Sequence, residues 1–108
     1  MSYKNEFKSC LDDLFESLCD VSDWMYENPE LGFQEFKTSK YLVDYIQHNS
    51  KPVNYPSHNL ETAFDVTFGE VGPLTVICVE YDALPEIGHA CGHNIIATAS
   101  IGAGLGLK

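Results

Sequence analysis

Apolar residues recur every three or four positions in the first half of the chain, which is the spacing of one face of an α-helix. This pattern predicts a first helix over residues 5–27, with acidic side chains on its other face. A second helix is predicted over residues 33–48, after a break at Asn28–Gly32 whose proline and glycine favour a turn. The side chains expected on the buried faces are Phe7, Leu11, Leu14, Leu18, Val21, Met25, Phe36, Leu42, Val43, Tyr45 and Ile46.

The second half of the chain changes to the pattern of strands. Residues 49–61 contain two prolines and no periodicity, so they predict a loop. Residues 62–68 alternate between apolar and polar side chains, as in a half-buried strand. Leu74–Glu80 is apolar on both faces, which is typical of a central strand. The short connection at residues 69–73 predicts that the two strands form an antiparallel β-hairpin.

A last helix of small residues is predicted over residues 94–107. Gly102, Gly104 and Gly106 oppose this prediction, since each costs about 1 kcal/mol relative to alanine in a helix. They would allow close packing against the sheet or mark a frayed helix end, and they lie too far into the helix for a dinucleotide-binding turn. The predicted fold is therefore α/β, with two helices, a β-hairpin and a helix against the sheet in one domain over residues 1–108.

Charge and composition exclude some classes of function. The chain has 108 residues, six lysines, no arginine and a net charge of −10, which argues against nucleic-acid binding and against a basic membrane-surface helix. No apolar run is long enough for a membrane span, and the first residues do not resemble a signal peptide. We therefore expect a cytoplasmic protein, with its four cysteines present as thiols rather than disulfides.

The polar loop between the second strand and the last helix carries the candidate chemistry. Cys91 and His93 are two residues apart with a glycine between them, and both side chains are favoured ligands of zinc and similar divalent metals. A buried thiol and a helix-capping histidine are the structural alternative. Glu80 and Asp82 follow an apolar strand, where buried carboxylates need a compensating partner. Asp82 could orient a metal-bound imidazole, or it could be a turn residue before Pro85.

Two further interpretations of the histidines and the thiol stay open. Cys91 could be a nucleophile with His89 or His93 as its base, but no Asn or Asp that would orient the base is evident in the sequence. His48 is interpreted as a cation at a helix C-terminus, and His58 as a surface residue in a loop.

Two stretches of the chain resemble the M20 metallopeptidase family. They are residues 28–35, Asn-Pro-Glu-Leu-Gly-Phe-Gln-Glu, and residues 80–94, Glu-Tyr-Asp-Ala-Leu-Pro-Glu-Ile-Gly-His-Ala-Cys-Gly-His-Asn. The similarity extends from about Val21 to the end and is greatest to the amidohydrolase branch, within it to the M20 domain-containing protein 2 group. Many members of this branch have Asp after the Cys-Gly-His step, where this chain has Asn94, as that group does.

The resemblance implies a metal-dependent hydrolase that cleaves the amide bond of a dipeptide or an N-acyl amino acid. It implies that Cys91 and His93 are ligands in a two-metal site, with zinc most expected and manganese or cobalt as alternatives, and that Asp82 orients the metal centre. The parent enzyme is expected to be a homodimer. The family's Glu-Glu pair, its further histidine ligands and its lid domain have no counterpart in residues 1–108, so we expect this chain to be a partial catalytic domain that is inactive alone. A non-catalytic remnant that binds metal weakly, or that associates with a full-length partner, is the alternative.

Overall fold

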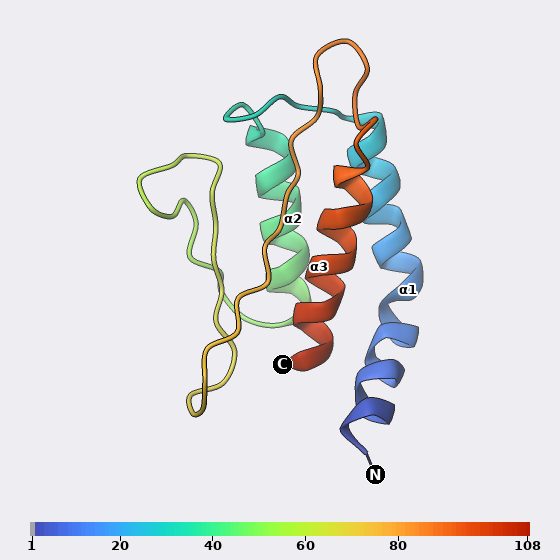
Figure 1. Cartoon of the computed structure of the whole chain (residues 1–108), viewed down its shortest axis with the longest axis vertical. Helices are drawn as coiled ribbons and strands as arrows, with labels where there is room; N and C mark the ends of the chain where they lie inside the picture. Colours follow the sequence, from blue (N-terminus) through green and yellow to red (C-terminus); the bar gives the residue numbers. More distant parts are fainter. Residues whose placement is uncertain (1) are drawn as a thin grey trace.

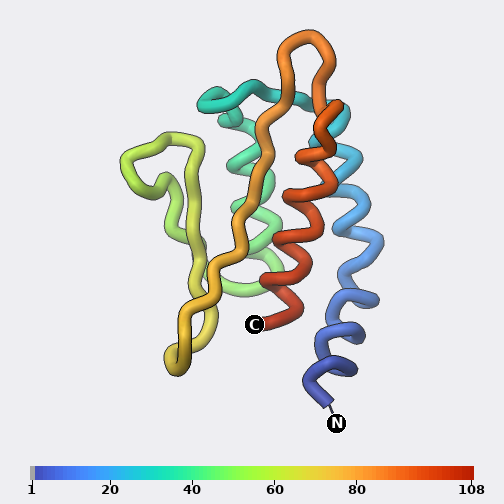
Figure 2. Tube along the Cα trace, in the orientation of Figure 1, coloured from blue at the N-terminus to red at the C-terminus, as the bar shows by residue number. Residues whose placement is uncertain are grey.

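The computed structural model describes residues 2–108 as three helices and non-helical connections (Figure 1). The helices are α1 (Tyr3–Glu27), α2 (Phe36–Asn49) and α3 (His93–Leu107), which confirms the three predicted from the sequence. Figures 1 and 2 show that α1 runs antiparallel to the other two and that α3 lies between α1 and α2. Among residues 2–108, no helix combines the length and apolar character that a membrane crossing requires.

The core contains side chains from all three helices, among them Val21 and Met25 of α1. Met25 and Leu42 are fully buried, which agrees with the prediction from helical spacing. Helices α1 and α2 each bury one apolar face in this core, whereas α3 is apolar on most of its surface. The buried cluster consists of Val21, Met25, Leu42, Ile46, Ala97, Ile101 and Leu105.

Helix α2 begins three residues later than the sequence pattern predicts. Phe33 has a left-handed backbone conformation (φ 65°), and the Gln34 amide donates to the Leu31 carbonyl at 2.9 Å, so a turn occupies these positions. As a result, Phe36 is the first helical residue and is half exposed rather than buried. Apolar spacing could not detect this turn, because the spacing reports which side of a helix is covered and not the backbone conformation of a single residue.

Two glycines of α3, Gly102 and Gly106, face α1, whereas the sequence analysis expected the glycines to pack against a sheet or to mark a frayed end. A Cβ atom at Gly106 would lie 2.7 Å from two ring carbons of Phe7, and one at Gly102 would lie 3.1 Å from Leu18 Cδ1. Gly104 is different, because a Cβ atom there would meet nothing within 4 Å. The i, i+4 pair of glycines therefore permits close contact between the two helices.

The predicted β-hairpin of residues 62–68 and 74–80 is not present in the structure. Asp65 instead pairs with Asn54, through amide-to-carbonyl hydrogen bonds of 2.9 and 3.0 Å. Residues 74–80 make no backbone hydrogen bond with another segment of residues 2–108, and Leu74 and Val76 are 78% and 73% exposed rather than buried. The apolar pattern alone does not produce a strand, because a strand also needs a neighbouring strand for its hydrogen bonds.

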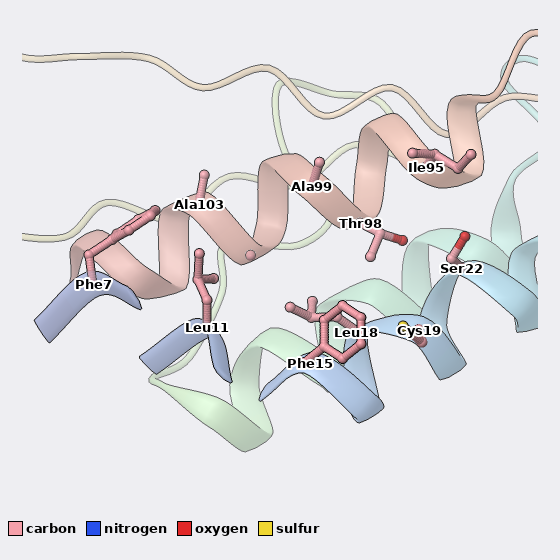
Figure 3. A pocket seen from close by; sticks show the side chains of 11 residues that line it. Phe7, Leu11, Phe15, Leu18, Cys19, Ser22, Ile95, Thr98, Ala99 and Ala103 are labelled. Atoms are coloured by element: carbon pink, nitrogen blue, oxygen red, sulfur yellow. The ribbon is translucent and has the colours of Figure 1, made fainter. Parts of the chain in front are cut away.

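An apolar groove of about 430 Å³ lies between α1 and α3 (Figure 3). Its lining includes Phe7, Leu11, Phe15 and Leu18 from α1, and Ile95, Ala99 and Ala103 from α3. None of the residues that the sequence analysis selected for chemistry lines this groove.

Candidate metal centre

The polar loop lies at one end of the molecule, where α1 ends and both α2 and α3 begin (Figure 1). Two hydrogen bonds between Leu84 and Gly88 close the loop, at 2.9 and 3.1 Å. Gly88 and Gly92 both have a positive φ, of 64° and 77°, a conformation that glycine adopts without steric cost. Gly92 is the residue immediately before α3, so this turn places Cys91 and His93 on either side of the helix start.

The structure brings Asp82 and His93 into direct contact. The Nδ1 atom of His93 lies 2.8 Å from Asp82 Oδ1 and 2.9 Å from the Asp82 backbone oxygen. A carbonyl oxygen can only accept a hydrogen bond, so Nδ1 carries the proton and donates it. In the neutral imidazole, Nε2 then keeps a free lone pair, which is the form in which histidine binds a metal. A carboxylate that holds the other ring nitrogen in this way is a common neighbour of metal-binding histidines.

Cys91 takes no part in the contact between Asp82 and His93. Its side chain is exposed, and no hydrogen bond joins its sulfur to Asp82 or His93 in the described structure. Within residues 2–108, no group of three or more His, Cys, Asp and Glu side chains is arranged to hold a metal ion. A thiol and an imidazole with a free Nε2 suit a divalent metal chemically, but two donors do not complete its coordination.

Glu80 lies on the other side of the imidazole ring. Its Oε2 atom is 3.7 Å from His93 Nε2, which is too long for a hydrogen bond. The Glu80 side chain is largely exposed, while the His93 side chain is only 22% exposed. The free nitrogen of His93 therefore faces a solvated carboxylate.

Asn94 connects this loop to α1. Its amide nitrogen is 3.1 Å from the Ser22 hydroxyl oxygen and 3.4 Å from the Ser22 carbonyl oxygen, and the side chain is buried. A carboxylate at this position could not donate to the carbonyl of Ser22. Asn94 therefore has a structural role at the position where the resembled family often has Asp, because its side chain fixes the first turn of α3 against α1.

Two buried polar side chains near Asp82 have unpaired atoms. Glu35 is 8% exposed with Oε1 unpaired, and His89 is 6% exposed with neither ring nitrogen paired in the described residues. Burial raises the pKa of Glu35, and the negative charge of Asp82 adds to this effect. Burial and the proximity of His93 lower the pKa of His89, while Asp82 opposes that change. The sequence offered His89 only as a candidate base and gave Glu35 no role beyond its place in the stretch 28–35, because the burial of Glu35 depends on the tertiary fold.

We expect Glu35→Gln to change how stability depends on pH. The folded chain holds the Glu35 proton more tightly than the unfolded chain does, so the contribution of Glu35 to wild-type stability falls as pH rises from the ordinary pKa of 4.5 through the raised pKa. Glutamine has no proton to lose, so the variant should gain stability relative to wild type above this window and not below it. Urea unfolding between about pH 4 and about pH 8 measures the difference.

The matched control for this experiment is Glu27→Gln, because Glu27 is exposed at the end of α1. The control should unfold with nearly the same pH dependence as wild type. If the free energies of unfolding of Glu35→Gln and wild type changed with pH in the same way, the inferred raised pKa of Glu35 would be contradicted.

The chain is similar to several curated hydrolases, while no family model matches it. It is 33% identical to the human Xaa-Arg dipeptidase over 113 residues, which cover 92% of this chain and 26% of that protein. It is 29% identical over 119 residues to a polypeptide of the p-aminobenzoyl-glutamate hydrolase of Escherichia coli, covering 91% of this chain and 25% of that polypeptide. An N-acetyldiaminopimelate deacetylase of Geobacillus thermodenitrificans is 32% identical over 99 residues, which cover 72% of this chain and 25% of that protein.

These relatives are named as hydrolases of dipeptides, of an aminobenzoyl-glutamate conjugate and of an N-acetyl amino acid. This confirms the broader part of the resemblance, namely that the homologues of this chain are amidohydrolases and dipeptidases. The chain spans about a quarter of the length of the relatives that it matches.

Proposed function

We propose that this chain is part of the catalytic domain of an M20-type, metal-dependent amide hydrolase, and that the complete enzyme cleaves a dipeptide or an N-acyl amino acid. The observation that carries the proposal is the Asp82–His93 contact, in which the carboxylate and the carbonyl hold Nδ1 at 2.8 and 2.9 Å. Similarity to the named hydrolases supports the reaction class. Asn94 supports the narrower assignment to the M20 domain-containing protein 2 group.

In this proposal Cys91 and His93 bind the metal and Asp82 orients His93. Zinc is the first candidate, with manganese or cobalt as alternatives, because a thiolate and an imidazole suit all three. When bound, the metal would polarise the substrate carbonyl and lower the pKa of a water molecule. Two ligands from this chain leave the remaining ligands and the general base to other residues, so we expect residues 1–108 alone to be inactive.

The same proposal extends to the fold and the setting of the complete enzyme. Residues 74–80 would form a strand in the sheet of an α/β catalytic domain, which their exposed apolar side chains and unpaired backbone support. The complete enzyme would be a cytoplasmic homodimer.

Metal binding can be tested on the 108-residue chain with cobalt(II), which absorbs strongly in the near ultraviolet when a thiolate is a ligand. We expect weak, saturable binding with this absorption band, because only two ligands are present. Cys91→Ser should abolish the band, while Cys19→Ser should retain it, since Cys19 is an exposed thiol on α1. Absence of the band in the wild-type chain, or its persistence in Cys91→Ser, would refute Cys91 as a metal ligand.

Hydrolysis can be tested with a chimera in which residues 1–108 replace the segment of the human Xaa-Arg dipeptidase to which they align. We expect the chimera to hydrolyse a dipeptide, and we expect Cys91→Ser to remove that activity while Cys19→Ser keeps it. A folded chimera that contains metal but hydrolyses nothing would overturn the catalytic proposal and favour the non-catalytic alternative.

A further inference from the structure

The connection between α1 and α2, residues 28–35, lies next to the loop that carries Asp82. The Ala83 amide donates to the Glu30 carbonyl at 2.7 Å, and Leu31 and Ala83 form a parallel bridge. A Cβ atom at Gly32 would lie 4.0 Å from Asp82 Cβ, so the backbone of the connection also lies close to the Asp82 side chain. Segments about fifty residues apart in the sequence therefore meet at Asp82 and Ala83.

The side chain of Glu30 contacts the start of α2, whereas its carbonyl contacts Ala83. Its Oε1 atom accepts hydrogen bonds from the amide and the hydroxyl of Thr38, each at 2.6 Å, and its Oε2 atom accepts from the Lys37 amide at 3.2 Å. The first amides of a helix have no partner inside the helix, and a negative charge near them is favourable. Glu35, the residue immediately before α2, provides no such hydrogen bond, so the carboxylate of Glu30 caps this helix.

One residue thus connects a helix end to the candidate metal centre. Three hydrogen bonds to α2 restrain the side chain of Glu30, and its carbonyl holds Ala83, which directly follows Asp82. Asp82 in turn holds His93 Nδ1 through both its carbonyl and its carboxylate. The orientation of the imidazole therefore depends on a backbone position that Glu30 restrains.

We propose that Glu30 is a positioning residue for the candidate metal centre: by capping α2 and bonding Ala83, it holds Asp82 where it keeps His93 in the Nδ1–H tautomer. Without the carboxylate, the Glu30 backbone is less restrained and the hydrogen bond to Ala83 weakens. Asp82 then no longer presents two acceptors to Nδ1, and the ring populates the Nε2–H tautomer, whose metal-binding nitrogen is blocked by a proton. This inference deepens the proposed function, but it concerns the chain without metal.

The test measures the histidine tautomers of the ¹⁵N-labelled chain by NMR, at a pH above which the ring signals no longer change. His93→Gln identifies the His93 signals. We expect Nδ1–H to dominate in wild type, and Glu30→Ala to lower the ratio of Nδ1–H to Nε2–H about tenfold, as the loss of one hydrogen bond to a charged group implies. Glu30→Gln keeps one acceptor oxygen for Thr38, so it should restore part of the ratio.

Ser2→Ala is the matched control, since it removes a cap hydrogen bond of 3.2 Å at the start of α1. The control should lower the melting temperature and leave the His93 ratio unchanged. If Glu30→Ala lowers the melting temperature but leaves the ratio at the wild-type value, Glu30 is a helix cap only and the proposal is wrong. If Glu30→Ala does not fold, the test uses Glu30→Gln instead: a His93 ratio equal to that of wild type would then show that the proposal is wrong. Because no metal is added, this outcome is independent of the cobalt experiment.

Discussion

Replacing Asp82 by alanine should weaken divalent metal binding by about 10–100-fold, which is the usual cost of losing a residue that orients a metal-binding histidine. The reason is the hydrogen bond of 2.8 Å between Asp82 Oδ1 and His93 Nδ1, which holds the ring and keeps its proton away from Nε2. Without the carboxylate, only the backbone carbonyl at 2.9 Å remains as an acceptor. The change is measured as the cobalt(II) dissociation constant of the chain at constant pH.

Two further variants make this result interpretable. Asp82→Asn keeps an oxygen that can accept from Nδ1 but removes the charge, so its affinity should fall between those of wild type and Asp82→Ala. Asp44→Ala removes an exposed carboxylate on α2 whose ion-pair partner is Lys40 at 3.2 Å, and it should leave the affinity unchanged. Equal cobalt affinity for Asp82→Ala and wild type would show that Asp82 does not act through His93.

Met25→Ala should lower the free energy of unfolding by about 2–5 kcal/mol, the range for truncating a large, fully buried aliphatic side chain. Met25 has no exposed surface and belongs to the cluster in which all three helices meet. A loss of this size is a large share of the total stability of a small domain, which is about 5–15 kcal/mol. Urea unfolding followed by circular dichroism measures it.

The neighbouring residue supplies the control for this prediction. Tyr26 is 66% exposed, so Tyr26→Ala should change the free energy of unfolding by no more than about 0.5 kcal/mol. A similar small loss for Met25→Ala would mean that the three helices do not share one core in solution. In that case α3 would not be held against α1, and the position of His93 at its start would also be lost.

The local features of the site are readable from the sequence, but most of its contacts are not. The Cys91, Gly92 and His93 step identifies two candidate metal ligands by residue type and spacing alone. The pairing of Asp82 with His93 joins residues eleven positions apart, and the sequence suggested it only as one of two roles for Asp82. The contribution of Glu30 was not predictable, because its side chain and its carbonyl bond to segments that only the fold brings together.

The sequence by itself determined the three helices and most of the buried positions of α1 and α2, because helix hydrogen bonds are local and apolar spacing reports which side is covered. It also placed the candidate chemistry in the turn before α3. The tertiary structure decided which segments pair, as Asp65 with Asn54 and Ala83 with Glu30. It also placed Gly102 and Gly106 of α3 against α1 and buried Glu35 and His89 beside Asp82. These features depend on contacts between distant residues, which no local pattern encodes.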